Sequence, residues 1–180
     1  MRATGIVRRI DDLGRVVIPK EIRRTMRIRE GDPLEIYTDS DGRVIFKKYS
    51  PLGELSNFAG QYADVLCRTG GHPVVVCDRD RVISVAGAPK KELLERRVSG
   101  TLEESMNQRR LFAYNAASGS KIKPVEGDER FAIAGAPIVV AGDVCGSIMF
   151  LTDSDNTRAG DAELKLITTA AAFLGKQMEE

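Results

Sequence analysis

The sequence has no long hydrophobic run, only one histidine and only three cysteines in 180 residues. Its longest stretch without a charge, residues 131–142, is interrupted by a proline, whereas a membrane-spanning helix needs about 20 apolar residues. Arg8 and Arg9 come too early for the apolar core of a signal peptide. An odd number of cysteines does not make a disulfide framework. We therefore expect a soluble, cytoplasmic protein.

The same scarcity argues against catalysis and metal binding. His72 is the only candidate for a histidine-dependent nucleophilic site, and it precedes Pro73 at the expected start of a strand. Cys67, His72 and Cys77 do not have the spacing of a zinc site. Neither a Walker-type phosphate loop nor a dinucleotide-binding glycine motif is present, and the paired acidic residues fall in turn-like stretches. The sequence predicts no metal, no cofactor and no enzyme activity.

What the sequence does have is an uneven distribution of charge. Its 27 basic and 26 acidic residues nearly cancel, yet residues 1–29 hold nine Lys or Arg against three Asp or Glu. A basic segment on a near-neutral chain favours a polyanion as the partner of that end alone. Because arginine donates in a planar fork that fits phosphate oxygens and guanine edges, this segment predicts nucleic-acid binding. A solvated charged face is the alternative.

The apolar pattern predicts an α+β protein with two domains, residues 1–50 and residues 51–180. In the first we expect a helix at 20–28 between strands at 4–10, 15–18, 34–37 and 44–46. One short helix between strands excludes a helix-turn-helix. In the second we expect helices at 51–68, 90–98, 102–110 and 161–180, and strands at 73–77, 82–86, 131–140 and 144–151. A loop is expected at 115–130, and no internal repeat is evident.

Residues 4–19, TGIVRRIDDLGRVVIP, resemble the signature of the AbrB-type transition-state regulators. The match continues through EIRRTM at 21–26, GDPLEIY at 31–37 and FKKY at 46–49. The resemblance implies a swapped-hairpin β-barrel in which two chains interleave their strands as a homodimer. It also implies double-stranded DNA as the partner, contacted by the arginines that match the family's own: Arg8, Arg15, Arg23 and Arg24. Arg9 and Lys20 are further candidates from the same basic cluster.

Residues 53–178 resemble a GAF domain, an antiparallel sheet with flanking helices. The combination is similar to sporulation regulators of spore-forming bacteria, which implies a transcription factor that activates and represses genes in the forespore. The GAF fold implies an unidentified small-molecule effector, although the cyclic-nucleotide and bilin motifs of some GAF domains are not evident. The candidate lining residues are Phe112, Tyr114, Phe131 and Ile133, for which ordinary core packing is the alternative.

The helices expected at 51–68 and 161–180 carry apolar residues at alternating steps of three and four. With one apolar stripe on the sheet and another on a partner, helix pairs from two subunits would form a four-helix bundle and a homotetramer. The candidate oligomerisation residues are Leu52, Leu55, Tyr62, Leu66, Ile167 and Leu174.

Two other classes of function stay open. An AbrB-fold antitoxin would have another protein as its main partner, but its tail would be short, whereas residues 51–180 have their own helices and hairpins. An enzyme of the GAF fold that reduces methionine sulfoxide would need a catalytic cysteine arrangement, and none is recognisable.

Overall fold

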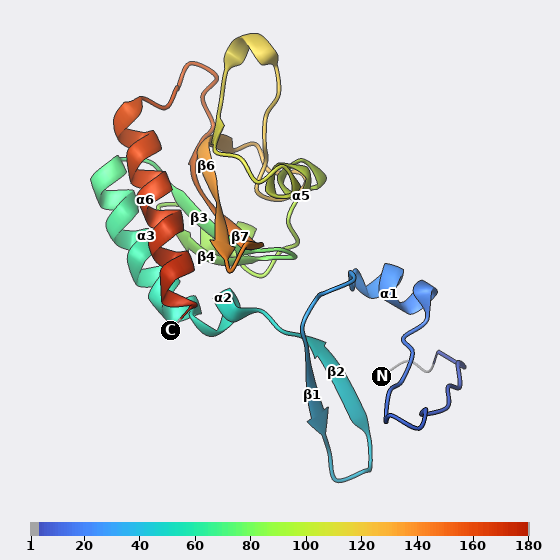
Figure 1. The fold of residues 1–180 in the computed structure, drawn as a ribbon. Coiled ribbons are helices and arrows are strands. Elements are labelled where there is room, and N and C mark those ends of the chain that lie inside the picture. Colours follow the sequence, from blue (N-terminus) through green and yellow to red (C-terminus); the bar gives the residue numbers. More distant parts are fainter. Residues whose placement is uncertain (1–3, 180) are drawn as a thin grey trace. The chain divides into compact units, whose positions relative to one another are not determined.

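The computed structural model describes residues 4–179 (Figure 1). The chain divides into two compact units, Met1–Tyr49 and Ser50–Glu180. Within the described range, no helix combines the length and the apolar character that crossing a membrane would require.

The first unit contains one helix and one β-hairpin. Helix α1, Lys20–Met26, begins after Pro19, and strands β1, Leu34–Thr38, and β2, Val44–Lys48, pair antiparallel. Gly42 takes a φ of 76° in the hairpin loop, a backbone conformation that glycine adopts without strain. The hairpin that Asp41-Gly42 predicts is therefore present.

The strands expected at 4–10 and 15–18 are not formed within the single chain. A tight turn joins the two segments: the amide of Gly14 donates to the carbonyl of Asp11 at 3.0 Å. Beyond this turn, neither segment belongs to a sheet in the described part of the chain. A strand needs a neighbouring edge for its backbone hydrogen bonds, and β1 and β2 pair only with each other here. Alternation of apolar residues alone therefore overpredicts these two strands for an isolated chain.

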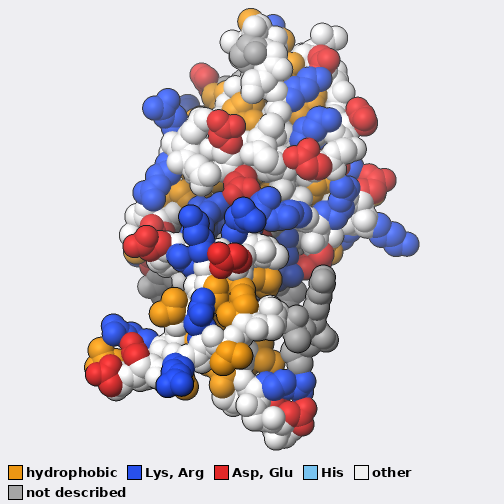
Figure 2. Space-filling model, turned by 90° about the vertical axis from the view of Figure 1, so that its right-hand side faces the viewer, with side chains coloured by type: hydrophobic (Ala, Val, Ile, Leu, Met, Phe, Trp, Pro, Cys, Tyr) orange, Lys and Arg blue, Asp and Glu red, His pale blue; other side chains and the backbone are white. Residues whose placement is uncertain are grey.

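The first unit also has almost no core of its own. Pro19 is the only buried residue among those described in this unit. Figure 2 shows part of the resulting apolar surface in orange. The exposed large apolar side chains are those of Ile6, Val7, Ile10, Leu13, Val16, Val17, Met26, Ile36, Tyr37, Val44, Ile45, Phe46 and Tyr49. A surface this apolar is typical of an interface rather than of a monomer.

The second unit is a five-stranded antiparallel sheet in the order β4-β3-β7-β6-β5. Its strands are β3 Val74–Asp78, β4 Val82–Ala86, β5 Phe112–Ala113, β6 Phe131–Val140 and β7 Asp143–Thr152. Its helices are α2 Pro51–Glu54, α3 Ser56–Gly70, α4 Lys90–Leu93, α5 Gly100–Asn107, the 3₁₀ turn η1 Ala116–Ser118, and α6 Asp161–Gln177. The predicted α+β fold with an antiparallel sheet and flanking helices is confirmed.

Helices α3 and α6 lie side by side on one face of the sheet, and α5 covers the other face (Figure 1). The pleat of β7 supplies both cores, because successive side chains point to opposite faces. Ile148 and Phe150 join the core under α3 and α6, while Met149 and Leu151 join the core under α5. The sheet therefore separates two hydrophobic layers.

Local signals explain where most helices begin and end. Ser50 caps α2 by accepting a hydrogen bond from the amide of Gly53 at 3.1 Å, and Pro51 occupies the first helical position, as expected. The predicted helix at 51–68 is broken at Leu55 into α2 and α3, and α3 ends at Gly71 with a φ of 70°. The helix expected at 90–98 ends at Leu93. Beyond it, the amide of Glu95 donates a hydrogen bond to the carbonyl of Val82 on β4 instead of to a carbonyl of the helix.

Candidate nucleic-acid interface and sensory pocket

All six basic side chains predicted to bind DNA are exposed on the first unit. Arg8 and Arg9 precede the turn at 11–14, and Arg15 follows it. Lys20, Arg23 and Arg24 lie on α1. Of the six, only Arg15 pairs with a carboxylate among the described residues. Charged groups that are exposed and unpaired are free to form the charge-assisted hydrogen bonds that phosphate oxygens accept.

The ends of α1 hold its arginines in place. Arg23 and Arg24 lie in the last turn, where positive charge complements the helix dipole. The amide of Ile28 donates to the carbonyl of Arg23 at 2.8 Å and closes the helix in the manner of a Schellman motif. Lys48 on β2 then donates from Nζ to the carbonyl of Arg27 at 3.0 Å. Helix α1 is thereby fixed to the hairpin of the same unit.

The turn that carries Arg15 is organised by one carboxylate. Asp11 Oδ1 accepts from the amides of Leu13 at 3.1 Å and Arg15 at 2.7 Å, and Asp11 Oδ2 accepts from Arg15 Nε at 2.8 Å. The hydrogen bond from the Arg15 amide, followed by that from its side chain, lowers the pKa of Asp11 below its ordinary value. Asp11 thus stays ionised and holds Arg15 at the end of the turn.

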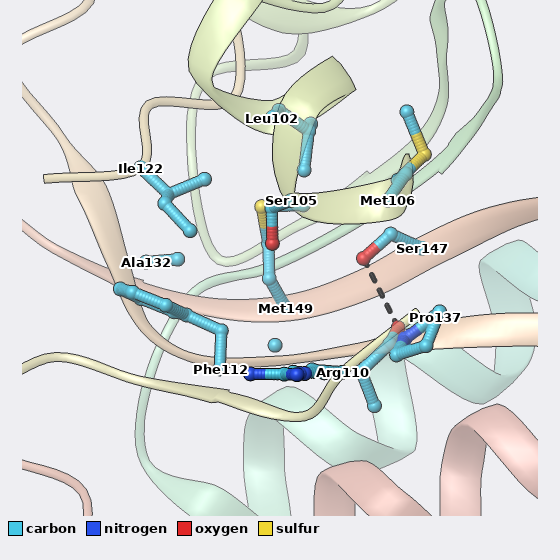
Figure 3. A pocket seen from close by; sticks show the side chains of 12 residues that line it. Leu102, Ser105, Met106, Arg110, Phe112, Ile122, Ala132, Pro137, Ser147 and Met149 are labelled. Atoms are coloured by element: carbon cyan, nitrogen blue, oxygen red, sulfur yellow. Dashed lines mark hydrogen bonds between the residues drawn. The ribbon is translucent and has the colours of Figure 1, made fainter. Parts of the chain in front are cut away.

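A small pocket lies between α5 and the sheet of the second unit (Figure 3). Its cavity volume is about 10 Å³, which corresponds to about one water molecule. Its walls come from α5, the segment between α5 and β5, β5, β6, β7 and the loop before β6: Leu102, Ser105, Met106, Arg110, Phe112, Ile122, Ala132, Gly135, Ala136, Pro137, Ser147 and Met149. Side chains of the protein therefore fill most of this space.

The structure brings only one of the four predicted ligand-binding residues to this pocket. Phe112 lies in its wall, whereas Tyr114, Phe131 and Ile133 are outside its lining. Tyr114 and Phe131 pack edge to face, with ring centroids 4.7 Å apart, and Ile133 belongs to the core under α3 and α6. The lining residues on α5 and β7 were not predicted from the sequence. The alternation of Ser147 and Met149 along one strand is the signal that places both on the same face of the sheet.

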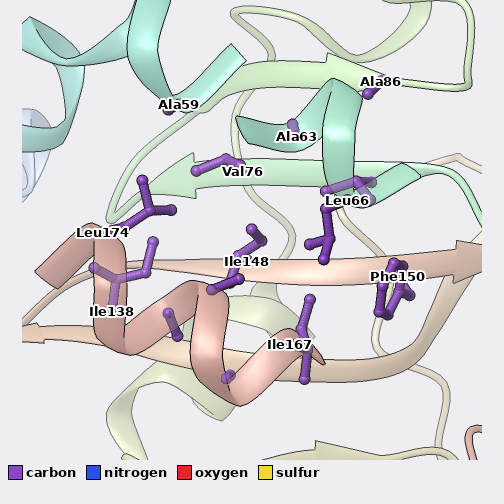
Figure 4. Packing of buried hydrophobic residues seen from close by; sticks show 14 of the residues in the cluster. Ala59, Ala63, Leu66, Val76, Ala86, Ile138, Ile148, Phe150, Ile167 and Leu174 are labelled. Carbon is purple, nitrogen blue, oxygen red and sulfur yellow. The ribbon is translucent and has the colours of Figure 1, made fainter. Parts of the chain in front are cut away.

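The predicted oligomerisation residues require a correction. Leu52, Leu66, Ile167 and Leu174 are buried in the core of the single chain, so their side chains are not available to a partner. Figure 4 shows Leu66, Ile167 and Leu174 in this core. The seam of apolar residues faces the sheet, because both helices pack on the same sheet face. Leu55 and Tyr62 are only half-buried. The apolar surface that the helices leave outside consists of Val65, 61% exposed, and Phe173, 41% exposed, with Phe58 and Tyr62 packed beside Phe173.

The surroundings of the three cysteines favour the protonated thiol. Burial raises the pKa of the thiols of Cys67, Cys77 and Cys145 above the ordinary value. A raised pKa keeps a thiol protonated, whereas the thiolate is the reactive form. In the described residues, no three His, Cys, Asp or Glu side chains come together as metal ligands would.

Comparison with known proteins relates both units to transcription factors. A family model described as "Stage V sporulation protein T C-terminal, transcription factor" matches residues 54–179. Stage V sporulation protein T of Bacillus subtilis (strain 168) is 51% identical to this chain over 181 residues, which cover 100% of both proteins. The chain belongs to the stage V sporulation protein T family. It is a regulator of transcription in sporulation, as the sequence predicts.

Each unit also has its own relatives. Transition state regulatory protein AbrB of B. subtilis is 63% identical over 51 residues, 28% of this chain and 52% of that protein. A family model described as "Antidote-toxin recognition MazE, bacterial antitoxin" matches residues 7–53. The GAF domain of an Acinetobacter phosphoenolpyruvate-protein phosphotransferase has a TM-score of 0.57 at 12% identity, covering 69% of this chain and 81% of that one. The predicted resemblances to an AbrB-type domain and a GAF domain are confirmed.

Proposed function

We propose that this chain binds specific sequences of double-stranded DNA through Arg8, Arg15, Arg23 and Arg24, with Arg9 and Lys20 beside them. The observation that carries the proposal is the exposed basic group of the first unit, in which Arg15 alone has a carboxylate partner among the described residues. The 63% identity between this chain and AbrB over 51 residues supports the same conclusion. Activation and repression of genes in the forespore are part of the proposal.

The DNA-binding form is a homodimer whose two first units interleave their strands into one barrel. This arrangement is supported by the exposed apolar residues of the unit and by Pro19 being the single buried residue among those that the structure describes there, because a unit of this size needs a shared core to fold. The segments 4–10 and 15–18, which have no sheet neighbour in the described chain, would pair with the partner.

The second unit joins dimers into a tetramer and senses a small molecule. The exposed apolar stripe of α3 and α6, which includes Val65 and Phe173, supports the first role. The GAF fold supports the second. An effector in the pocket beside Phe112 would have to displace the flexible side chains of Met106 and Met149, which line the small cavity. Thermal unfolding of the full chain across a metabolite panel tests for such an effector, and a uniformly unchanged midpoint would favour a purely structural domain.

Arginine-to-alanine variants test the DNA contacts. We expect Arg15→Ala and Arg23→Ala each to weaken binding to a duplex selected by the full-length protein by about 30-fold or more, because the homodimer loses two contacts and one bidentate contact is worth about 1–3 kcal/mol. The salt dependence of binding should also become shallower, because each dimer loses two phosphate or base contacts. Fluorescence anisotropy at several salt concentrations measures both effects.

Arg43→Ala is the matched control, because Arg43 is an exposed arginine of the same unit whose side chain pairs with Asp39 and Asp41. We expect it to leave affinity unchanged. Wild-type affinity in single variants of all four proposed arginines would contradict the assignment. The match of residues 7–53 to an antitoxin family supports the antitoxin alternative. That alternative would be favoured if the wild-type chain binds no DNA but binds a co-expressed toxin.

A further inference from the structure

Two loops of the first unit, residues 11–15 (DDLGR) and residues 39–43 (DSDGR), have the same construction. In both, the amide of the first residue donates to the carbonyl of the fifth, at 3.1 and 3.2 Å, and the amide of the glycine donates to the first carbonyl, at 3.0 and 3.1 Å. The leading aspartate accepts from the amide of the closing arginine, at 2.7 and 3.0 Å. This five-residue repeat escaped the sequence analysis, which found no internal repeat.

The third residue distinguishes the two loops. In the loop 39–43 it is Asp41, which binds Nη2 of Arg43 while Asp39 binds Nε, so two carboxylates share one guanidinium. In the loop 11–15 it is Leu13, which is 69% exposed. Among the residues that the structure describes, Asp11 is the one carboxylate that binds Arg15, through Nε. Both Nη groups of Arg15 are therefore without a carboxylate partner in the described part of the chain.

We infer that Asp11 is a positioning residue that aims Arg15 at DNA, and that Leu13 keeps the two Nη groups of Arg15 available to it. The inference rests on the proposed binding of DNA by Arg15. A hydrogen bond at Nε restricts rotation of the guanidinium plane, so less side-chain entropy is lost when the Nη groups bind a guanine edge or a phosphate. The loop 39–43 keeps the same scaffold, but its arginine is covered by Asp41.

The direction in which one substitution changes the affinity for DNA distinguishes this role from long-range electrostatics. Asp11 brings negative charge close to the DNA backbone, so long-range electrostatics alone predicts tighter binding when that charge is removed. A positioning role predicts weaker binding to the specific sequence. Asp11→Asn is suitable, because its amide oxygen still accepts from the backbone amides that form the turn, while its ionic contact with Arg15 is lost.

The experiment measures the affinities of full-length variants for a selected duplex and for an unrelated duplex at one salt concentration. We expect Asp11→Asn to weaken specific binding about 10- to 100-fold, the cost of ordering one long side chain in each of the two subunits, with unrelated DNA bound as well as or better than by wild type. Asp39→Asn is the same change in the loop 39–43, and it should alter neither the affinity for the selected duplex nor that for the unrelated duplex. Leu13→Asp should weaken specific binding more than Leu13→Asn, because a second carboxylate would cover Arg15 as Asp41 covers Arg43.

Specific binding by Asp11→Asn that equals or exceeds wild type, with an unchanged thermal unfolding midpoint, would overturn the positioning role. Equal binding by Leu13→Asp and Leu13→Asn would overturn the role of Leu13. Arg15→Ala separates these outcomes from failure of the proposed function. If Arg15→Ala binds specific DNA normally, Arg15 is not a contact at all; if it binds weakly while Asp11→Asn does not, only the present inference fails.

Discussion

The ion pair between Asp128 and Arg130 lies within the loop before β6, and Arg130 joins this loop to Glu92 on α4. Arg130 Nε donates to Asp128 Oδ1 at 2.8 Å, and Arg130 Nη2 donates to Asp128 Oδ2 at 2.9 Å. The Asp128 side chain is 4% exposed and that of Arg130 17%, and Arg130 also binds Glu92. This bidentate geometry gives the pair more strength than an ordinary surface ion pair.

We expect Asp128→Ala to destabilise the second unit by about 1–3 kcal/mol, because it leaves the largely buried Arg130 without its main partner. Asp155→Ala, which removes an exposed partner of Lys121, should cost about 0–1 kcal/mol. Urea unfolding of the full chain measures both. A smaller loss for Asp128→Ala than for Asp155→Ala would show that the buried pair contributes no more stability than an exposed one.

The contribution of Asp128 should also depend on pH. Burial alone would raise the pKa of Asp128, but the hydrogen bonds from Arg130 outweigh it and leave the pKa below its ordinary value. A carboxyl group whose pKa is lowered by folding contributes stability above its unfolded pKa, about 3.9, and loses it as the pH falls through the folded value. The stability difference between wild type and Asp128→Ala should therefore shrink only below about pH 4.

At the scale of elements, the sequence predicts the helices and most strands of the second unit but not which residues share a face. The pattern of residues 131–140 suggests a regular strand, yet its pairing with β7 shifts between Ala132 and Ala134. Ala132 consequently lies in the core under α5, while Ala134 lies in the core under α3 and α6. Because of this bulge, Ile133 lies on the sheet face opposite the pocket. The alternation of apolar residues in the sequence does not indicate the bulge.

The helix seams show the same difficulty. Steps of three and four describe any amphipathic helix, so they do not distinguish a sheet-facing stripe from a partner-facing one. Packing decides the question here, because Leu66 and Leu174 are 4% and 0% exposed within one chain. By contrast, the arginines proposed to contact DNA come from the motifs of residues 4–19 and 21–26, which assign a position to each of Arg8, Arg15, Arg23 and Arg24; that assignment stays a prediction.

The exposed stripe of α3 and α6 yields a test of the proposed tetramer. We expect Val65→Asp and Phe173→Asp to split it into dimers, because burying an unpaired carboxylate in an interface costs several kcal/mol. Both residues are exposed in the single chain, so the fold should survive. Asn57→Asp, an isosteric change at another exposed position of α3, is the control.

Light scattering of the full-length variants gives the answer. If the wild-type chain is only a dimer, or if both aspartate variants remain tetrameric, the stripe is not the interface. Leu66→Asp and Leu174→Asp do not serve as tests, since a charge at either buried site would unfold the domain.

At the scale of the whole molecule, the two units differ in how much of their fold one chain completes. The second unit encloses two hydrophobic layers around its sheet. The first unit leaves Ile36, Val44 and Phe46 exposed, and two of its expected strands lack a neighbour in the described chain. The sequence motif predicts a barrel shared by two chains, and the exposed apolar surface of the single chain is the physical counterpart of that prediction.

A chain of residues 1–53 should therefore be an obligate dimer. Folding of such a short segment as a monomer would leave Val17, Ile36 and Phe46 in water, and the 61% exposure of Ile36 in the single chain indicates how little it could bury alone. Dilution should therefore dissociate and unfold the chain in a single step, so that its unfolding midpoint rises with protein concentration. Analytical ultracentrifugation and circular dichroism over a concentration series measure both properties. A folded monomer at low micromolar concentration, with a midpoint independent of concentration, would contradict the interleaved barrel and leave DNA recognition to a single chain.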